Sequence, residues 1–536
     1  MKYAKLQSVL FLHAVAAHCT PRAYDSANDV TYKGLVRNGI EVFLNIPYGQ
    51  DTGGANRFKP PRPHVPVAGS TVKAQSYGPS CPQPLGAINA PLALTPIVDV
   101  SEDCLNLNIA RPDGTEEGDE LPVIVWIHGG GFWTGSNSEI TTAPDGMVQQ
   151  SVENGNPIIH VAVNYRLGFF GFAQSDALLS EGSTNAGMRD QRLALEWVRD
   201  NIEYFGGDPN RVTIFGQSSG GLAVGLHLLA YGGDKPVPFQ RAIAQSQCLE
   251  PGLTGTFTID AMQALVDHIG CNEADLHSDE TVECLRAFDT ENLLNASIAT
   301  KFDDLAHNIG DIWLPSVDGD FLPAAPSELI RDGRLAIVPT MFGWTDKDLN
   351  IYVSTDVKTA EQTHELISAY LPGVTSDNID TLLSLYPVSD FEAGSSEDLV
   401  PEFHRSARIV RDIIMSCEPL FYAQQLRKHG NKDLYVYDWN QTVFDPLLEH
   451  FGLPAGMGPD EALLRRGSRT WSTFATYGKP SLEGHETFEG VVGQLQDELE
   501  IYERFRFLQT DGIVDCGAQW SRWVQDLNVA KFTIFA

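Results

Sequence analysis

The chain has 536 residues, 43% of them hydrophobic and 20% charged, which suits a folded globular protein with a large apolar core. Its 37 basic residues stand against 70 acidic ones, and the resulting formal net charge of -33 argues against a nucleic-acid-binding surface. Beyond the N-terminus, no apolar run is long enough for a membrane-spanning helix.

The N-terminus has the pattern of a secretory signal peptide. A short basic region at residues 1–5 precedes an apolar stretch, Val9 to Ala17, which contains small residues at a suitable cleavage site. The alternative is an apolar N-terminus of an intracellular protein, but eight cysteines favour an oxidising compartment. We therefore predict a signal peptide at residues 1–17, secretion, and a single domain over residues 18–536, since no linker or repeat divides the chain.

Residues 41–63 predict a strand followed by irregular chain among prolines. The next segment is closed by Cys81 and Cys104, with 22 residues between the two cysteines, and it is rich in Pro, Ala and Leu. This composition is too hydrophobic for a segment that only faces solvent.

A continuous apolar run, Leu121 to Ile127, has the pattern of a parallel strand buried on both faces. Ile158 to Tyr165 predicts a second buried strand, and Gly187 to Asn201 predicts a helix. Alternating strands and helices indicate an α/β fold with a large, mostly parallel sheet flanked by helices. Partly helical insertions at 258–335 and 355–430 separate three further predicted strands: Arg241 to Gln245, Val338 to Gly343 and Leu434 to Trp439.

A glycine-rich turn, His128-Gly129-Gly130-Gly131, directly follows the strand predicted at 121–127. With no Cβ atoms in the way, the N–H groups of Gly130 and Gly131 can face a substrate oxygen. The alternative is a plain turn that closes the strand, but the serine motif downstream favours the catalytic interpretation. His128 belongs to this turn and is not expected to act as a catalytic base.

The sequence Gly216-Gln217-Ser218-Ser219-Gly220 joins a predicted strand at 211–215 to a predicted helix at 221–230. This G-x-S-x-G turn carries a nucleophilic serine, because its glycines let the backbone hold Ser218 in a strained conformation with an exposed hydroxyl. The helix that follows directs its free N–H groups toward developing negative charge. The N–H of Ser219 would complete a three-donor oxyanion hole with those of Gly130 and Gly131.

Two stretches, Phe215 to Gly221 and Glu102 to Asn108, resemble the two signature motifs of the type-B carboxylesterase family, which includes cholinesterases. The resemblance extends over nearly the whole chain from about residue 30 and implies an α/β-hydrolase fold. Further blocks similar to the family are Phe43 to Tyr48, Asn164 to Arg166, Asn185 to Gln191 and Trp471 to Pro480.

The resemblance also implies three disulfides: Cys81–Cys104, Cys271–Cys284 and Cys417–Cys516. Spacing alone does not determine the pairing, and no C-x-x-C pair supports a metal or redox site. Of the other cysteines, Cys19 lies beside the predicted cleavage point, and Cys248 is expected to be a buried free thiol. Asn295 and Asn440 begin Asn-x-Ser/Thr sequences and are candidate glycosylation acceptors.

The catalytic acid and base must follow the serine in chain order, each after a strand. In the family, the acid lies a few residues past a strand that ends in glycine. The matching register here selects Asp348, with Leu349 in place of the usual glycine and Asp346 as the competitor. An aspartate can orient an imidazole and stabilise its charged form; a solvated charged turn is the alternative.

The base is the least clear member of the triad. The family places it after the strand that corresponds to Leu434–Trp439, in a His-Gly-Ser/Thr-Asp/Glu context, and this context is missing here. His450 is the only histidine in the window, but its neighbours predict a helix, so a surface histidine is an equal alternative. His485 lies in a polar stretch and is a poor substitute.

These residues predict a serine carboxylesterase with an acyl-enzyme mechanism, acting on a small-molecule ester without metal or cofactor. The Cys81–Cys104 segment would border the pocket, and its short length favours soluble esters over emulsified triglycerides. Phe132, Trp133 and Trp344 are candidate pocket walls, with core packing as the alternative. Two other hypotheses are a binding protein with an impaired triad and a dedicated hydrolase of one secondary metabolite or thioester.

Overall fold

The computed structural model describes residues 20–86, 93–301, 311–345, 347–350, 352–371, 374–394, 399–439, 461–482 and 487. Several predicted features lie outside these residues: the signal peptide, Asp346, Asn440, His450, His485 and Cys516.

A nine-stranded sheet forms the centre of the molecule, in the order β12-β11-β10-β9-β7-β8-β6-β4-β3. Six adjacent strands pair in parallel: β12, β11, β10, β9, β7 and β8. At the other end of the sheet, β6 pairs antiparallel with β8, β4 with β6, and β3 with β4. The strands are β3 Leu35–Arg37, β4 Ile40–Pro47, β6 Asn106–Pro112, β7 Leu121–Ile127, β8 Ile159–Val163, β9 Gly207–Gln217, β10 Arg241–Gln245, β11 Thr340–Thr345 and β12 Leu434–Trp439.

A separate three-stranded sheet lies near the described N-terminal end. Its strands are β1 Arg22–Asp25, β2 Val30–Lys33 and β5 Thr71–Lys73, in the order β1-β2-β5.

The central strands are apolar at consecutive positions because both faces of the sheet are covered. In β7, Val123, Val125 and Ile127 belong to the main core, whereas Ile124 and Trp126 join a second core on the opposite face. This alternation follows from the two-residue period of a strand. The predicted α/β fold with a mostly parallel sheet is therefore confirmed.

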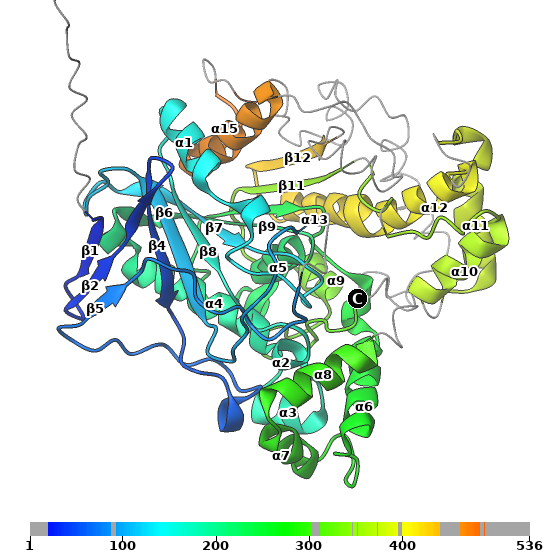
Figure 1. Cartoon of the computed structure of the whole chain (residues 1–536). Helices are drawn as coiled ribbons and strands as arrows, with labels where there is room; N and C mark the ends of the chain where they lie inside the picture. The colour runs from blue at the N-terminus through cyan, green and yellow to red at the C-terminus, as the bar shows by residue number, and fades with distance from the viewer. Residues whose placement is uncertain are drawn as a thin grey trace, which may run out of the picture.

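Helices cover the sheet on both faces, with α1 and α15 on one side and α4, α5 and α9 on the other (Figure 1). The helices near the sheet are α1 Asp145–Glu153, α2 Gly168–Phe172, α3 Asp176–Glu181, α4 Ala186–Asn201, α5 Ser219–Leu229, α9 Pro326–Asp332, α13 Cys417–Lys428 and α15 Glu461–Tyr477. No helix in the described part of the chain combines the length and the apolar character needed to traverse a bilayer.

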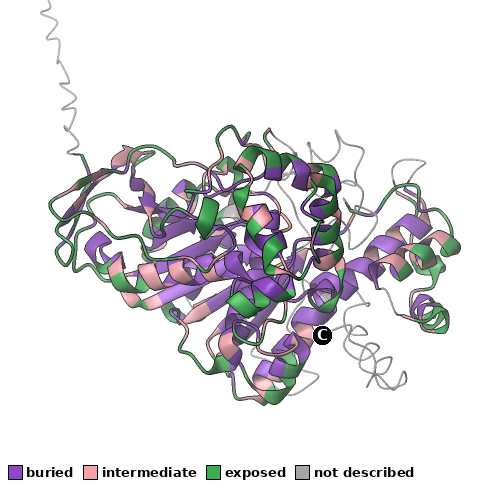
Figure 2. Cartoon of the chain, turned by 90° about the horizontal axis from the view of Figure 1, so that it is seen from below, coloured by how far each residue is buried: buried purple, intermediate pink, exposed green. Residues whose placement is uncertain are grey.

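The two predicted insertions are helical, and their outer helices project from the body of the molecule, whereas α9 and α13 at their C-terminal ends lie close to the sheet (Figure 1). Figure 2 shows the central strands buried and these helices exposed along their outer faces. The first insertion contains α6 Phe257–Ile269, α7 Asp279–Ala287 and α8 Thr290–Lys301, and the second contains α10 Ala360–Tyr370, α11 Ser376–Leu385 and α12 Pro401–Arg411.

Candidate active site

Ser218 stands in the turn between β9 and α5, at the carboxyl end of the sheet. Its backbone has φ 58° and ψ -132°, a region that L-residues rarely adopt, while its N–H donates to the carbonyl of Gln245 at 2.9 Å. Strain of this kind is usually retained where function requires it. Ser218 as a whole is only partly buried, unlike its neighbours Ser219 and Gly220 in α5.

The glycines of this turn are required by close backbone contacts. A Cβ on Gly216 would lie 2.5 Å from the carbonyl carbon of Gly220 and 2.8 Å from the carbonyl oxygen of Ile127. A Cβ on Gly220 would lie 3.0 Å from the carbonyl group of His128. Any larger residue at either position would push the serine turn away from β7.

The glycine-rich turn after β7 lies directly beside Ser218. A Cβ on Gly129 would be only 3.1 Å from the Cβ of Ser218. Gly130 and Gly131 both have positive φ, 110° and 62°, and both are partly exposed. Among the described residues, the N–H groups of Gly130 and Gly131 donate no hydrogen bond. Ser219 is the first residue of α5, where an N–H has no partner within the helix.

Two hydrogen bonds fasten this glycine-rich turn in place. The N–H of Phe132 donates to the Oγ of Ser219 at 3.1 Å, which joins the turn to α5. The hydroxyl of Tyr165 donates to the carbonyl of His128 at 2.7 Å, and the ring of His128 stacks on that of Tyr165. Gly130, Gly131 and Ser219 therefore lie on a braced framework.

His128 is buried, and burial lowers its pKa to about 4. Its imidazole is therefore neutral at physiological pH. Its Nδ1 lies 3.0 Å from the carbonyl oxygen of Gly129, in agreement with a role in the turn.

Asp348 follows β11 and points toward the end of β10. Its Oδ1 accepts from the Ser246 hydroxyl at 3.1 Å, and its Oδ2 accepts from the Thr345 N–H at 2.7 Å. Burial raises the pKa of Asp348, and its hydrogen bonds oppose that shift. Ser246 directly follows β10, which pairs with both β9 and β11, so β10 lies between the strand that leads to Asp348 and the strand that leads to Ser218.

The sequence did not single out Ser246, although a signal was present. It is the first residue after the predicted strand at 241–245, and polar residues at the carboxyl ends of parallel strands gather at one edge of a sheet. No bond between Asp348 and a histidine occurs among the described residues. The predicted base His450 lies outside them, as does Asp346, the competitor for the acid position.

The candidate pocket walls divide into two groups. Phe132 is fully buried and packs against Phe172 and Tyr165, and Trp344 belongs to the main core, so both correspond to the core-packing alternative. Trp133 is only partly buried and lies over Gly168, where a Cβ would be 2.8 Å from its ring.

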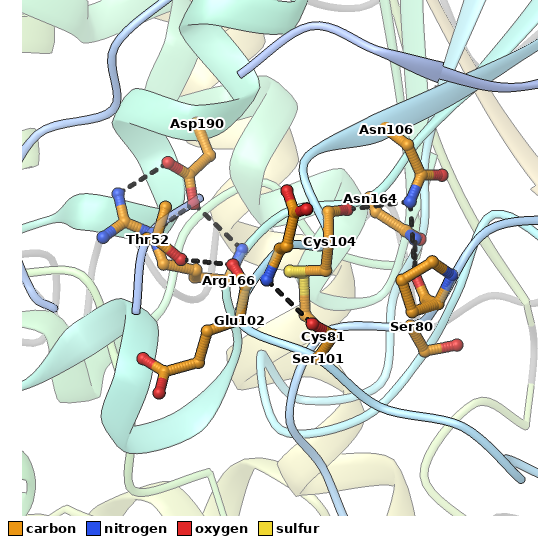
Figure 3. The surroundings of a disulfide bond; sticks show 12 residues. Thr52, Ser80, Cys81, Ser101, Glu102, Cys104, Asn106, Asn164, Arg166 and Asp190 are labelled. Carbon is orange, nitrogen blue, oxygen red and sulfur yellow. Dashed lines mark hydrogen bonds and ion pairs between the residues drawn. A yellow bond between two sulfur atoms is a disulfide. The ribbon is translucent and has the colours of Figure 1, made fainter. Parts of the chain in front are cut away.

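Cys81 and Cys104 form a disulfide at the base of the predicted border segment. Figure 3 shows it between the buried Arg166–Asp190 ion pair and the amide side chains of Asn106 and Asn164. The segment contacts the chain that follows the glycine-rich turn, because the side-chain amide of Gln83 exchanges two hydrogen bonds of 2.8 Å with the backbone of Gly135.

Cys271 and Cys284 form a second disulfide. Cys417 is also disulfide-bonded, and its predicted partner Cys516 lies outside the described residues. Cys248 is a buried free thiol.

The candidate glycosylation acceptor Asn295 is exposed on α8. The described residues contain no group of three or more His, Cys, Asp or Glu side chains arranged to hold a metal ion.

Two buried carboxyl groups lie near Cys248, on the chain that continues from β10 and on α13. Burial raises the pKa of Glu250 to about 8, while its side chain accepts from the Tyr370 hydroxyl at 2.7 Å. Glu418 is fully buried, neither of its oxygens has a hydrogen-bond partner among the described residues, and burial raises its pKa well above the usual value. Burial therefore favours the protonated form of both groups.

Comparison with known proteins adds to this geometry. A sequence model of the carboxylesterase family matches residues 29–511. The chain is 50% identical over 512 residues to a secreted lipase of Arthroderma benhamiae, covering 92% of this chain and 90% of the relative. It is 38% identical over 450 residues to an inactive carboxylesterase-like protein of Byssochlamys spectabilis, covering 81% of this chain and 76% of that one. The structure of EstA of Aspergillus niger matches with a TM-score of 0.69 at 24% identity, over 86% of this chain and 89% of EstA.

Proposed function

Because the chain belongs to the carboxylesterase family, we propose that it is a secreted serine hydrolase that cleaves small or medium carboxylic esters. The observation that carries this proposal is the position of Ser218, held in a strained turn beside the N–H groups of Gly130, Gly131 and Ser219. A serine held in this way can attack an ester carbonyl while the three donors receive the negative oxygen.

The reaction has two halves. The Oγ of Ser218 attacks the ester carbonyl as its proton passes to His450, whose imidazole is oriented by Asp348. The tetrahedral oxyanion is held by the N–H groups of Gly130, Gly131 and Ser219. It collapses to an acyl-enzyme as the imidazolium gives its proton to the departing alcohol oxygen. Water, deprotonated by the same imidazole, then releases the acid and restores Ser218. These steps require no metal or cofactor.

The test is hydrolysis of p-nitrophenyl butyrate by the wild-type chain and by Ser218→Ala, His450→Ala and Gln217→Ala. We expect losses of 10³-fold or more in kcat for the first two variants, on the order seen for triad residues. Gln217 is exposed beside the nucleophile, so Gln217→Ala serves as the control for local folding. An organophosphonate should label the wild type at Ser218 and leave Ser218→Ala unlabelled.

Each outcome has a distinct meaning. Loss in Ser218→Ala alone would retain the nucleophile and remove His450 from the mechanism. Equal rates in all four proteins, together with no covalent labelling, would overturn the proposal. One relative is named a secreted lipase. If this protein hydrolysed a triglyceride emulsion faster than soluble esters, the proposed substrate class would be wrong.

A second candidate is a binding protein of the same fold without a working base. It is favoured by the missing family context around His450 and by the relative named an inactive carboxylesterase-like protein. In that case, the wild type would bind an ester analogue while hydrolysing p-nitrophenyl butyrate no faster than Ser218→Ala.

A further inference from the structure

Gln83 is completely buried in the segment that the disulfide of Cys81 and Cys104 closes (Figure 3). It stands between Pro82 and Pro84, whose rings restrict the backbone on both sides. Its Nε2 donates a hydrogen bond to the Cys81 carbonyl at 3.1 Å. The side-chain amide is therefore held by a stiff part of the chain.

This amide binds the backbone of a single glycine. The Nε2 of Gln83 donates to the Gly135 carbonyl at 2.8 Å, and the Gly135 N–H donates to the Oε1 of Gln83 at 2.8 Å. Among the described residues, the backbone of Gly135 makes no other hydrogen bond. Together with the bond to the Cys81 carbonyl, these bonds use both N–H groups and the oxygen of the Gln83 amide. They fix the position and the direction of the Gly135 backbone.

Gly135 lies directly against the glycine-rich turn. It has a φ of 122°, which residues with a side chain rarely adopt. A Cβ at this position would lie 2.5 Å from the carbonyl oxygen of Gly129 and 2.8 Å from the Cε1 of His128. The backbone that Gln83 holds is therefore packed on the first peptide group of the turn.

The chain between Gly129 and Gly135 is a tight loop. The carbonyl of Gly130 accepts from the N–H groups of Trp133 and Thr134, both at 3.0 Å. A Cβ on Gly130 would lie 2.8 Å from the carbonyl carbon of Thr134. A displacement of Gly135 would therefore also move Gly130, whose N–H is one of the proposed oxyanion donors.

We propose that Gln83 is a positioning residue that holds the N–H groups of Gly130 and Gly131 in place beside Ser218. This inference rests on the proposed function, in which these groups receive the negative oxygen. Gln83 does not touch the substrate; it acts through Gly135. Donors that are held in place before the reaction stabilise the transition state without the cost of reorganisation.

The experiment compares Gln83→Met with the wild type in the hydrolysis of p-nitrophenyl butyrate. Methionine keeps the length of the side chain but forms neither hydrogen bond to Gly135. The bond of 3.1 Å between the hydroxyls of Ser80 and Ser136 still joins the segment to the chain after the turn. Because both halves of the reaction form an oxyanion, kcat should fall by about tenfold to a hundredfold while KM changes little.

A second measurement isolates the oxyanion. With an alkyl trifluoromethyl ketone, the Oγ of Ser218 bonds to the carbonyl carbon, the hydroxyl proton passes to the base, and the carbonyl oxygen becomes an anion. The dissociation constant of this adduct should rise in Gln83→Met by the same factor by which kcat/KM falls. A partly unfolded preparation would instead lower the number of binding sites and leave the dissociation constant unchanged.

Gln191→Met is the matched control. Gln191 on α4 is also completely buried, and its Oε1 lies 3.0 Å from the Nε2 of His227 on α5. The substitution removes a buried amide without altering the contacts of Gly135. It should lower stability while kcat and the affinity for the ketone remain as in the wild type.

Gln83→Glu tests the same contact if Gln83→Met does not fold. A protonated carboxyl offers one O–H donor and one acceptor to Gly135, whereas an ionised carboxylate repels the Gly135 carbonyl. The kcat/KM of this variant, divided by that of the wild type at the same pH, should therefore fall as the pH rises from about 5 to about 9.

Wild-type kcat and ketone affinity in Gln83→Met would overturn the inference. Equal losses in Gln191→Met would also overturn it, as would a ratio that rises with pH in Gln83→Glu. If Ser218→Ala keeps full activity, the proposed function fails instead, and the two failures are thereby distinguished.

Discussion

The Oγ of Ser246 donates a hydrogen bond of 3.1 Å to the Oδ1 of Asp348, although 102 residues separate them in the chain. The two residues meet because β10 and β11 are parallel neighbours, so the segments after them emerge at the same edge of the sheet. Ser246 has a φ of 62°, an unfavourable value for a residue with a side chain. From the strain and the hydrogen bond together we infer that Ser246 orients Asp348, the acid of the proposed mechanism.

Ser246→Ala should therefore lower kcat/KM for p-nitrophenyl butyrate by about tenfold. The variant removes one hydrogen bond to a charged group, worth roughly 1.5–3 kcal/mol, and leaves the bond from Thr345 in place. The measurement is kcat/KM near neutral pH, with circular dichroism to verify the fold.

Ser246→Gly separates the hydroxyl from the backbone strain. Glycine accepts a positive φ without cost but also lacks the hydroxyl. Equal losses in the alanine and glycine variants would attribute the effect to the hydrogen bond. Full activity in Ser246→Gly would contradict the orienting role.

Ser218→Gly should be inactive and yet more stable than Ser218→Ala. Both variants lack the nucleophile, but only glycine relieves the backbone strain at φ 58° and ψ -132°. We expect the free energy of unfolding to rise by about 1 kcal/mol in the glycine variant relative to the alanine variant, measured by thermal denaturation. A lower stability of Ser218→Gly would show that the turn does not strain this residue.

Stability should fall as the pH rises, because the buried carboxyl groups of Glu250 and Glu418 hold protons in the native state. Their pKa values are raised by burial, to about 8 for Glu250, from an unfolded value near 4.5. Their contribution is fully present below pH ~4.5 and is lost as the pH rises toward the folded pKa, at up to about 1.4 kcal/mol per pH unit for each group. Glu418→Gln should therefore show a smaller drop in thermal midpoint between pH 5 and pH 8.

Glu283→Gln is the control for this experiment, because Glu283 is exposed on α7. Its thermal midpoint should follow the wild type across the same range. Identical pH dependence in Glu418→Gln and the wild type would show that Glu418 is not protonated in the native state at neutral pH.

The sequence predicted the elements that are buried on both faces with the greatest accuracy. β7, β10 and β12 have the predicted bounds, because an apolar run between turns leaves little freedom for a strand buried on both sides. The observed bounds of β8 and β9 differ from the predicted 158–165 and 211–215 by one to four residues at each end. The motif around Ser218 was equally informative, since a tight strand-to-helix turn restricts which residues are allowed at each position.

Contacts between residues that lie far apart in the sequence could not be predicted in this way. The partnership of Ser246 with Asp348, for example, requires knowledge that β10 and β11 are neighbours in the sheet. Phe132 and Trp344 show the same limit, because an aromatic residue near a catalytic motif can face either the core or a pocket, and these two face the core.

The hydrogen bond from the Phe132 N–H to the Ser219 hydroxyl makes the glycine-rich turn and the nucleophile helix a single mechanical unit. Helices α10 and α11 of the second insertion project away from that unit (Figure 1). Laboratory evolution can therefore vary or graft these two helices to change which molecules are admitted, while the serine turn and the glycine-rich turn are inherited unchanged from the scaffold.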